Sequence, residues 1–183
     1  RILDQVSFLE KRTDIAAVGC QYSLIDENNL DFGDMNWPIG LQNITYSIIT
    51  GYVPIGDPGS MIRHEVIKNV GFYRKDFEPA EDYDFWLRLV SMGYKIENLK
   101  KKLLKYRIHK HQATLMQDSK KKINQPKIFK KFYENITGDK ISLNIIKNYL
   151  DLFKFDKVET DYYLDNIFKI YFNLLRSKIL LNK

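Results

Sequence analysis

The sequence has little cysteine and no long apolar run, and both features narrow the class of protein. Its one cysteine, Cys20, excludes an intramolecular disulfide, and its place in an apolar stretch indicates a buried thiol. A single reduced cysteine favours a reducing compartment. No stretch of eighteen apolar residues occurs, and the start lacks the basic, apolar and small-residue regions of a signal peptide. These features predict a cytoplasmic protein.

Motifs for phosphate loops, zinc and nucleic-acid binding are also absent from the sequence. It contains neither a Gly-x-Gly-x-x-Gly turn nor a Gly-x-x-x-x-Gly-Lys loop. The net charge is nevertheless +6, and much of the excess comes from lysines at 100–102, 120–122, 127, 130 and 131. A basic surface of this kind suits an anionic lipid, a nucleotide diphosphate or nucleic acid, or is an ordinary solvated face. With no zinc pattern or ribonucleoprotein motif, we expect no nucleic-acid partner.

The composition is that of a globular α/β protein. Apolar residues make up 44% of the chain and charged residues 28%, and 183 residues suffice for one domain with a substantial core. Residues 30–42 lack a regular pattern, with a loop predicted at 37–40, and residues 53–59 are predicted to form a loop over the site. Apolar spacing predicts helices at 1–11, 43–50 and 64–70, strands at 16–25, 60–63, 94–99 and 103–108, and helices from 119 onward, with breaks near Pro126, Gly138 and Asp156 and a last helix at 162–181.

The most informative segment is 78–93, which predicts an amphipathic helix between Pro79 and Gly93 with acids in its first turn. Asp84 and Arg88 are four residues apart, the spacing of a structural ion pair. Two readings of Glu81 and Asp82 remain open. Acids at a helix start offset unpaired N–H groups and the helix dipole, and a carboxylate held there can also act as a catalytic base.

This helix and its surroundings resemble family-2 glycosyltransferases, which have the GT-A fold. The resemblance covers about residues 1–112 and is carried by the Ser-Met-Ile-Arg segment within 59–72, the Ala-Glu-Asp-Tyr-Asp helix, the Gly-Tyr-Lys-Ile segment at 93–96 and the Tyr-Arg-x-His segment at 106–109. It implies a partial GT-A mixed sheet with flanking helices. We expect residues 1–117 to form the acceptor-side part of this domain and 118–183 to form a helical extension.

The resemblance assigns catalytic roles to the acidic helix. Asp82 matches the family's general base, and the helix dipole at that position would keep its carboxylate ionised. Glu81 would orient the site. Trp86 lies one turn after Asp82, where it would stack on a sugar ring or fill the core.

The resemblance also implies donor and metal contacts. His109 matches a histidine that helps to bind a divalent manganese or magnesium ion, and neutral imidazole suits such ions. Arg107 would contact the diphosphate or a neighbouring acid. Gly59, Ser60 and Asp57 match a loop that lines the donor site.

Two family motifs are absent, and each absence shapes the expected activity. The metal-binding Asp-x-Asp half would precede Arg1, so this chain alone is expected to be inactive and to self-associate through an uncovered edge or apolar face. The Gln-x-x-Arg-Trp motif of processive synthases does not occur, which favours transfer of a single sugar. The resemblance implies that this transfer is inverting and runs from a nucleotide-sugar to a glycan, lipid-linked or cell-surface polysaccharide precursor.

The basic helical tail leaves a second hypothesis open. Its helices would either cover the sheet, lie on the inner face of a membrane near a lipid-linked acceptor, or form an oligomer contact. On the same scaffold, a non-catalytic module could use this tail to hold a membrane or a partner. Nucleotide-sugar turnover distinguishes the enzyme from the module.

Overall fold

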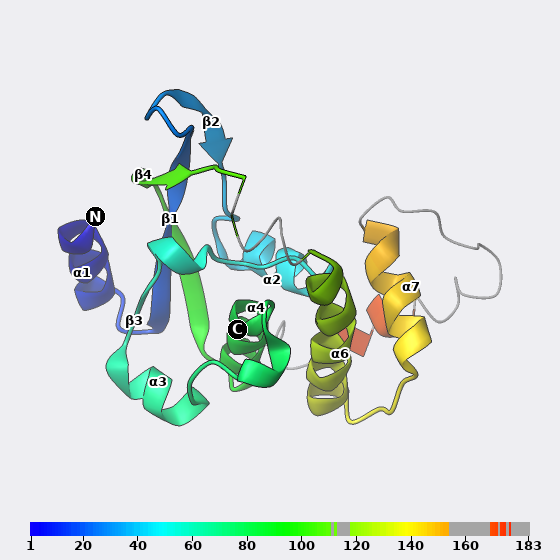
Figure 1. The fold of residues 1–183 in the computed structure, drawn as a ribbon. Coiled ribbons are helices and arrows are strands. Elements are labelled where there is room, and N and C mark those ends of the chain that lie inside the picture. Colours follow the sequence, from blue (N-terminus) through cyan, green and yellow to red (C-terminus); the bar gives the residue numbers. More distant parts are fainter. Residues whose placement is uncertain (111, 113–117, 154–168, 172, 175, 177–183) are drawn as a thin grey trace.

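The fold is a mixed sheet with helices on both sides, built from the order α-β-β-α-β-α-α-β-α-α (Figure 1). The computed structural model describes residues 1–110, 112, 118–153, 169–171, 173, 174 and 176. The elements are α1 (Ile2–Lys11), β1 (Ile15–Ile25), β2 (Asp31–Met35), α2 (Leu41–Ile49), η1 (Asp57–Gly59), β3 (Met61–Ile62), α3 (His64–Val70), η2 (Lys75–Phe77), α4 (Glu81–Ser91), β4 (Lys95–Arg107), α6 (Asp118–Thr137) and α7 (Leu143–Phe153).

Strand β1 is the centre of the sheet. It pairs antiparallel with β2 near its end and with β3 near its start, and it pairs parallel with β4 from Ile15 to Ile25. Its first eight residues are all buried, as expected of a strand covered on both faces. Cys20 lies in this strand and is buried, which confirms the predicted buried thiol.

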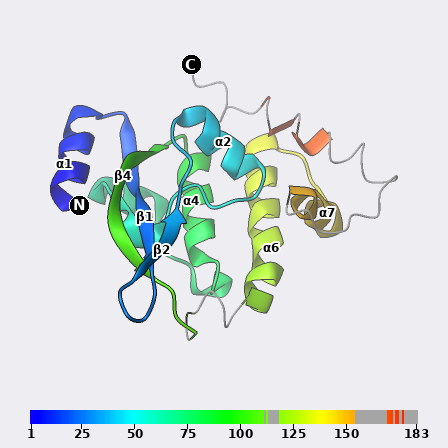
Figure 2. The ribbon, with the colours of Figure 1, turned by 90° about the horizontal axis from the view of Figure 1, so that it is seen from above.

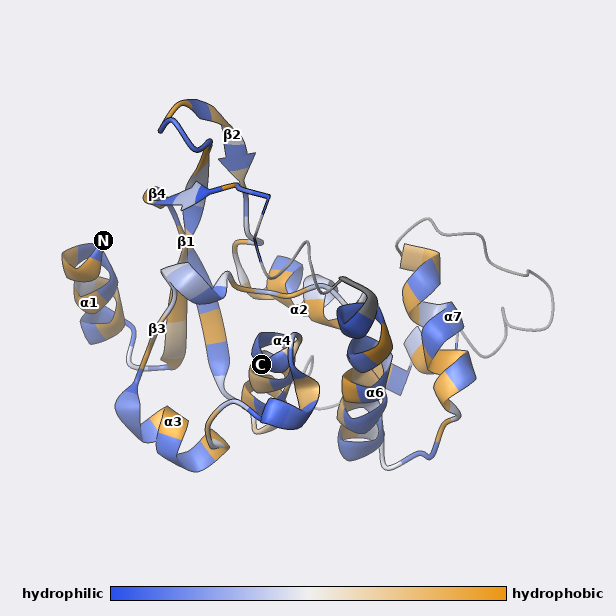
Figure 3. Ribbon diagram, viewed as in Figure 1, coloured by the Kyte–Doolittle hydropathy of each residue, from blue (hydrophilic) through white to orange (hydrophobic). Residues whose placement is uncertain are grey.

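The helices form layers on either side of this sheet. Figure 2 shows α1 on one side and α4, α6 and α7 successively farther out on the other. One hydrophobic cluster joins β1, α2, α4, α6 and α7, and a smaller one lies beneath α1. Apolar and polar residues mix along α6 and α7 (Figure 3), and three apolar residues of α6, Ile128, Phe129 and Phe132, are buried, whereas Ile123 is exposed. Burying each such side chain contributes roughly 1.5–3 kcal/mol.

The sequence predictions were wrong at two places and left one strand unassigned. Residues 31–35 form β2, which no pattern predicted because this strand is mostly exposed and lacks apolar alternation. One continuous strand, β4, replaces the two predicted ones, since its backbone pairs with β1 on both sides of a register shift at Lys100 and Lys101. Pro126 lies inside α6 and does not end it, because the following turn is held against the core.

The helices after residue 117 pack outside α4, on the side of the sheet that α4 covers (Figure 2). Helix α6 packs on α4 within the shared hydrophobic cluster, and Gly138 follows the end of α6 as predicted. The boundary at 117/118 itself stays a prediction. Of the predicted last helix at 162–181, only 169–171, 173, 174 and 176 are described, and the predicted break at Asp156 lies outside the described residues. Among described residues, no helix combines the length and apolarity needed to cross a membrane.

Candidate active site

The topology places the start of α4 at the end of the sheet where ligands commonly bind. A short turn at 92–94 joins α4 to β4, so the helix runs antiparallel to that strand. The start of α4, which carries Glu81 and Asp82, therefore lies toward the carboxyl ends of β1 and β4 (Figure 2). In open α/β sheets, binding sites form outside the carboxyl ends of the strands.

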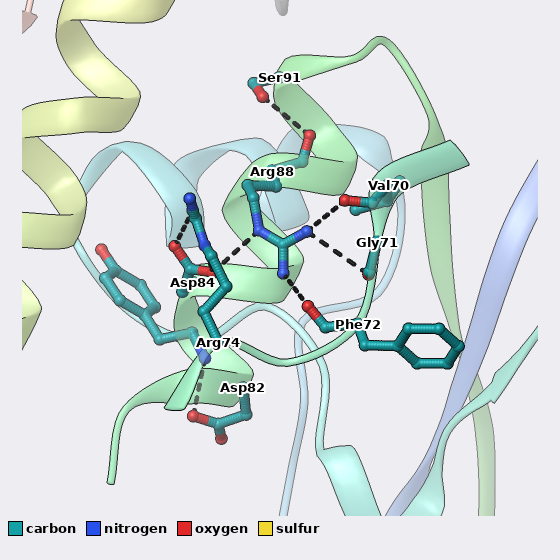
Figure 4. A network of polar contacts seen from close by, with 9 residues as sticks. Val70, Gly71, Phe72, Arg74, Asp82, Asp84, Arg88 and Ser91 are labelled. Atoms are coloured by element: carbon teal, nitrogen blue, oxygen red, sulfur yellow. Dashed lines mark hydrogen bonds and ion pairs between the residues drawn. The ribbon is translucent and has the colours of Figure 1, made fainter. Parts of the chain in front are cut away.

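Asp82 is half-buried in the first turn of α4, and its Oδ1 accepts a hydrogen bond from the Tyr83 N–H at 2.7 Å (Figure 4). Burial raises the pKa of Asp82, and the negative charges of Asp57 and Glu81 raise it further. The Tyr83 N–H and Lys121 act in the opposite direction. Desolvation therefore outweighs the favourable N–H contact at the helix start and raises the pKa of Asp82. The role of its carboxylate as an ionised base stays a prediction.

Asp57 and Tyr73 belong to the same site. The Tyr73 hydroxyl donates a hydrogen bond to Asp57 Oδ1 at 2.6 Å. Burial, followed by the charges of Asp57, Asp82 and Glu81, raises the pKa of Tyr73 above its ordinary value. These four residues, Asp57, Tyr73, Glu81 and Asp82, are called the acidic cluster below. Glu81 contributes a buried Oε2 that has no hydrogen-bond partner among the described residues.

Sequence reasoning missed Tyr73 and Lys121. Tyr73 lies in a short connection between α3 and η2, where only its aromatic character offered a signal. Lys121 belongs to a lysine run assigned to a solvated or membrane-facing surface. Only the packing of α6 on α4 brings its charge to Asp82, and no local pattern encodes that contact.

Gly59 and Ser60 hold the turn that carries Asp57. The Gly59 N–H donates to the Tyr22 hydroxyl at 2.9 Å, and its carbonyl accepts from Gln5 Nε2 at 2.7 Å. A Cβ at Gly59 would lie 2.4 Å from the Tyr22 ring. Ser60 Oγ donates to the Asp57 carbonyl at 2.9 Å. Both residues thus lie beside Asp57 of the acidic cluster, and their contact with a donor stays a prediction.

Arg107 and His109 lie beyond the acidic cluster along β4. The strand has 13 residues and α4 has 11, so at ordinary rises they span about 43 and 16 Å. Arg107 donates to the Asp26 carbonyl at 2.5 Å and to Asn29 Oδ1 at 2.6 Å. These hydrogen bonds hold the turn between β1 and β2 in place. Arg107 forms no ion pair with an acidic side chain of that turn.

His109 does not join a metal site within the described residues. No three histidine, cysteine, aspartate or glutamate side chains gather there in a way that could hold a metal ion. The residues present therefore do not fit the expected manganese or magnesium site by themselves. The divalent metal stays a prediction that depends on ligands from elsewhere.

Trp86 fills the core. Its side chain is fully buried and packs edge-to-face on Phe85, with ring centroids 5.1 Å apart. A sugar cannot reach this ring in the structure. Of the two alternatives for Trp86, the geometry matches the core-filling one, because its helix is enclosed between the sheet and α6.

An ion-pair network positions the loop that carries Tyr73. The Asp84 carboxylate is buried and accepts hydrogen bonds from Arg74 Nε and Arg88 Nε, each at 2.8 Å (Figure 4). Arg88 also donates to the carbonyls of Val70 and, at 2.8 Å, Phe72. The predicted Asp84–Arg88 pair is confirmed. It ties residues 70–74 to α4 and so fixes Tyr73 beside the helix start.

Comparisons with known proteins relate the chain to two proteins named as glycosyltransferases. No family model matches the chain. It is 27% identical over 165 residues to an uncharacterized glycosyltransferase of Haemophilus influenzae, covering 83% of this chain and 50% of that protein. It is 25% identical over 139 residues to an uncharacterized glycosyltransferase of Methanocaldococcus jannaschii, covering 74% and 46% respectively.

The chain thus spans about half the length of the curated relatives it matches. Its mixed sheet with flanking helices is consistent with part of a nucleotide-sugar transferase fold. These findings make the chain a distant relative of proteins named as glycosyltransferases.

Proposed function

We propose that the protein is a glycosyltransferase in which Asp82 is the general base. One observation carries the proposal most directly: a half-buried carboxylate with a raised pKa lies in the first turn of α4, beside Glu81 and Asp57. A base works best when its pKa lies near the operating pH, and burial moves that of Asp82 in this direction. The named glycosyltransferase relatives support the same reaction class.

The proposed reaction is an inverting transfer of one sugar from a nucleotide-sugar donor. The acceptor hydroxyl oxygen attacks the anomeric carbon and forms the new C–O bond, while Asp82 takes the hydroxyl proton. The bond to the nucleoside diphosphate breaks, and its electron pair leaves with the diphosphate. Glu81 and the Tyr73–Asp57 pair hold the acceptor hydroxyl and the base in position.

The finer features of the family resemblance belong to this proposal. They are membership of family 2, the GT-A fold, a cytoplasmic reaction, and a glycan, lipid-linked or polysaccharide-precursor acceptor. A divalent metal, bound mainly by residues outside the described part, would offset charge on the departing diphosphate. The roles proposed for Asp82, Glu81 and the Tyr73–Asp57 pair do not depend on that metal.

Transfer from a panel of nucleotide-sugars tests the proposal. Product formation is measured with manganese, using this chain and, where its gene continues upstream of Arg1, the longer product. Asp82→Asn should lower turnover about 100-fold or more, the usual range for losing a general base. Asp76→Asn removes an exposed acid from η2 and is the matched control. Unchanged turnover in Asp82→Asn would refute the assignment.

The alternative of a non-catalytic membrane-binding or partner-binding module gains no support from α6. Its apolar residues Ile128, Phe129 and Phe132 are buried against the rest of the protein and do not form a free membrane-facing surface. The lysines around them could still contact an anionic surface peripherally. Binding to anionic vesicles in the absence of any transfer activity would favour the module.

A further inference from the structure

A groove separate from the acidic cluster lies between α2 and the chain segments at 36–38 and 52–53. Its volume is about 470 Å³, enough for a ligand larger than a single water-sized group. Three aromatic residues and several amides and hydroxyls line it, including Asn36, Trp37, Asn43, Tyr46, Thr50 and Tyr52. The groove therefore has the mixed lining of a small-molecule site rather than that of a purely apolar contact surface.

The aromatic rings of the groove are both accessible and held in place. Tyr46 and Tyr52 are 56% and 46% exposed. The Tyr52 hydroxyl donates to the Phe153 carbonyl at 2.7 Å, which fixes its ring from the far end. Trp37 is half-buried and packs edge-to-face on Tyr22, with centroids 5.7 Å apart. Rings held this way can contact a ligand without a large loss of side-chain entropy.

Polar groups lie beside these rings. Asn43 and Tyr46 are three residues apart on α2, and Thr50, the C-cap of that helix, follows four residues later, so all three lie on the same side. The Asn43 amide donates to the Ile39 carbonyl at 2.8 Å, which fixes that side chain. Within the described part of the chain, neither the Tyr46 hydroxyl nor the Asn36 amide forms a hydrogen bond. Both are available to a ligand.

The lining contains no charged residue, although 28% of the chain is charged and the net charge is +6. By contrast, the groove between α1 and β4 is lined by Asp4, Lys11, Lys100 and Lys101 among others. An anionic nucleoside diphosphate would find no cationic partner in the α2 groove. A neutral ligand with apolar faces and many hydroxyl groups matches it instead, because aromatic rings pack on the C–H faces and amides bond the hydroxyls.

We propose that this groove binds a neutral oligosaccharide, namely the outer part of an acceptor glycan. The identification of the sugar as an acceptor rests on the proposed glycosyltransferase function, whereas the sugar binding itself rests on the groove. The groove adjoins the acidic helix through Gly51, which lies between Thr50 and Tyr52. A Cβ at Gly51 would be 3.8 Å from the hydroxyl of Tyr83, the residue after Asp82.

Saturation-transfer NMR with chitotetraose, cellotetraose and maltotetraose tests the proposal on this chain. We expect saturable binding of at least one sugar, and a change in Trp37 fluorescence, since the other tryptophan, Trp86, is fully buried. Tyr46→Ala should weaken binding roughly five- to tenfold, as for a central aromatic contact. The control Phe32→Ala removes a similarly exposed ring, 57% exposed, on β2 and should leave binding unchanged.

The outcomes separate this inference from the proposed function. Asp82→Asn should abolish transfer and keep sugar binding, because Asp82 does not line the groove. Sugar binding with no transfer by this chain or by the product extended upstream of Arg1 would refute the enzyme assignment alone. If none of the three sugars binds, or if Tyr46→Ala binds them as well as the wild type does, the oligosaccharide inference is wrong.

Discussion

The hydroxyl of Tyr73 donates to Asp57 Oδ1 at 2.6 Å and joins two loops at the start of the acidic helix. Tyr73→Phe removes this bond and nothing else of the ring, so Asp57 should lose its fixed orientation. We expect transfer to fall roughly tenfold, the usual effect of a hydrogen bond to a charged group, with little change in melting temperature. Tyr94→Phe, which removes an exposed hydroxyl contact with Asn69, should leave transfer unchanged. Equal activity in both variants would exclude a positioning role for Tyr73.

Asp82 should make stability fall as pH rises. Burial raises its folded-state pKa above the ordinary value of 3.8, so the folded protein binds the proton more tightly than the unfolded chain. Its contribution to stability is therefore fully present below that ordinary value and is lost as pH rises through the folded-state pKa. Asp82→Asn, which stays neutral, should melt at a higher temperature than the wild type at pH 7.

The difference in melting temperature between Asp82→Asn and the wild type should shrink as the pH falls toward and below the ordinary pKa of aspartate. Thermal melts from pH 3 to 8 measure it. A variant that is less stable than the wild type at pH 7 would show that the carboxylate of Asp82 is favoured by the fold.

Asp84 should matter far more for stability than an exposed acid. Its carboxylate is 2% exposed and is bound by Arg74 and Arg88, so removing it leaves the partly buried Arg88 unpaired. We expect Asp84→Ala to destabilise the fold by about 3–5 kcal/mol, as for other broken buried pairs. Chemical denaturation measures this free energy.

The matched control is Asp34→Ala, which removes an exposed partner of Lys102 and should cost less than about 1 kcal/mol. Similar free energies of unfolding for the two variants would mean that the Asp84 network does not hold residues 70–74 against α4.

Gly59 should tolerate no side chain. A Cβ there would lie 2.4 Å from the buried Tyr22 ring, so Gly59→Ala forces either the ring or the Asp57 turn to move. We expect a loss of about 1–3 kcal/mol of stability, together with reduced transfer. Gly33→Ala adds the same methyl group on β2, where the nearest atom is 3.8 Å away, and should be close to neutral. An equally stable Gly59→Ala protein would contradict the packing described here.

Several local elements could be predicted because their signals lie within a few residues. The apolar spacing from Phe85 to Leu89 and the acids before it predicted α4, and the Asp84–Arg88 spacing predicted their ion pair. By contrast, β2 has no apolar alternation, and it forms because the preceding turn returns the chain along β1. Pairing of this kind depends on the partner strand and leaves little trace in the strand itself.

The sequence by itself determined the acidic first turn of α4 and the buried central strand, because helix and strand periodicities are local. Tertiary structure decided which groups surround Asp82. It brought Asp57, Tyr73 and Lys121 to that carboxylate from three other segments, raised its pKa through burial, and enclosed Trp86 in the core. It also left an uncharged aromatic groove beside α2. Contacts between distant segments and the loss of water around a charge arise only once the helices pack on the sheet.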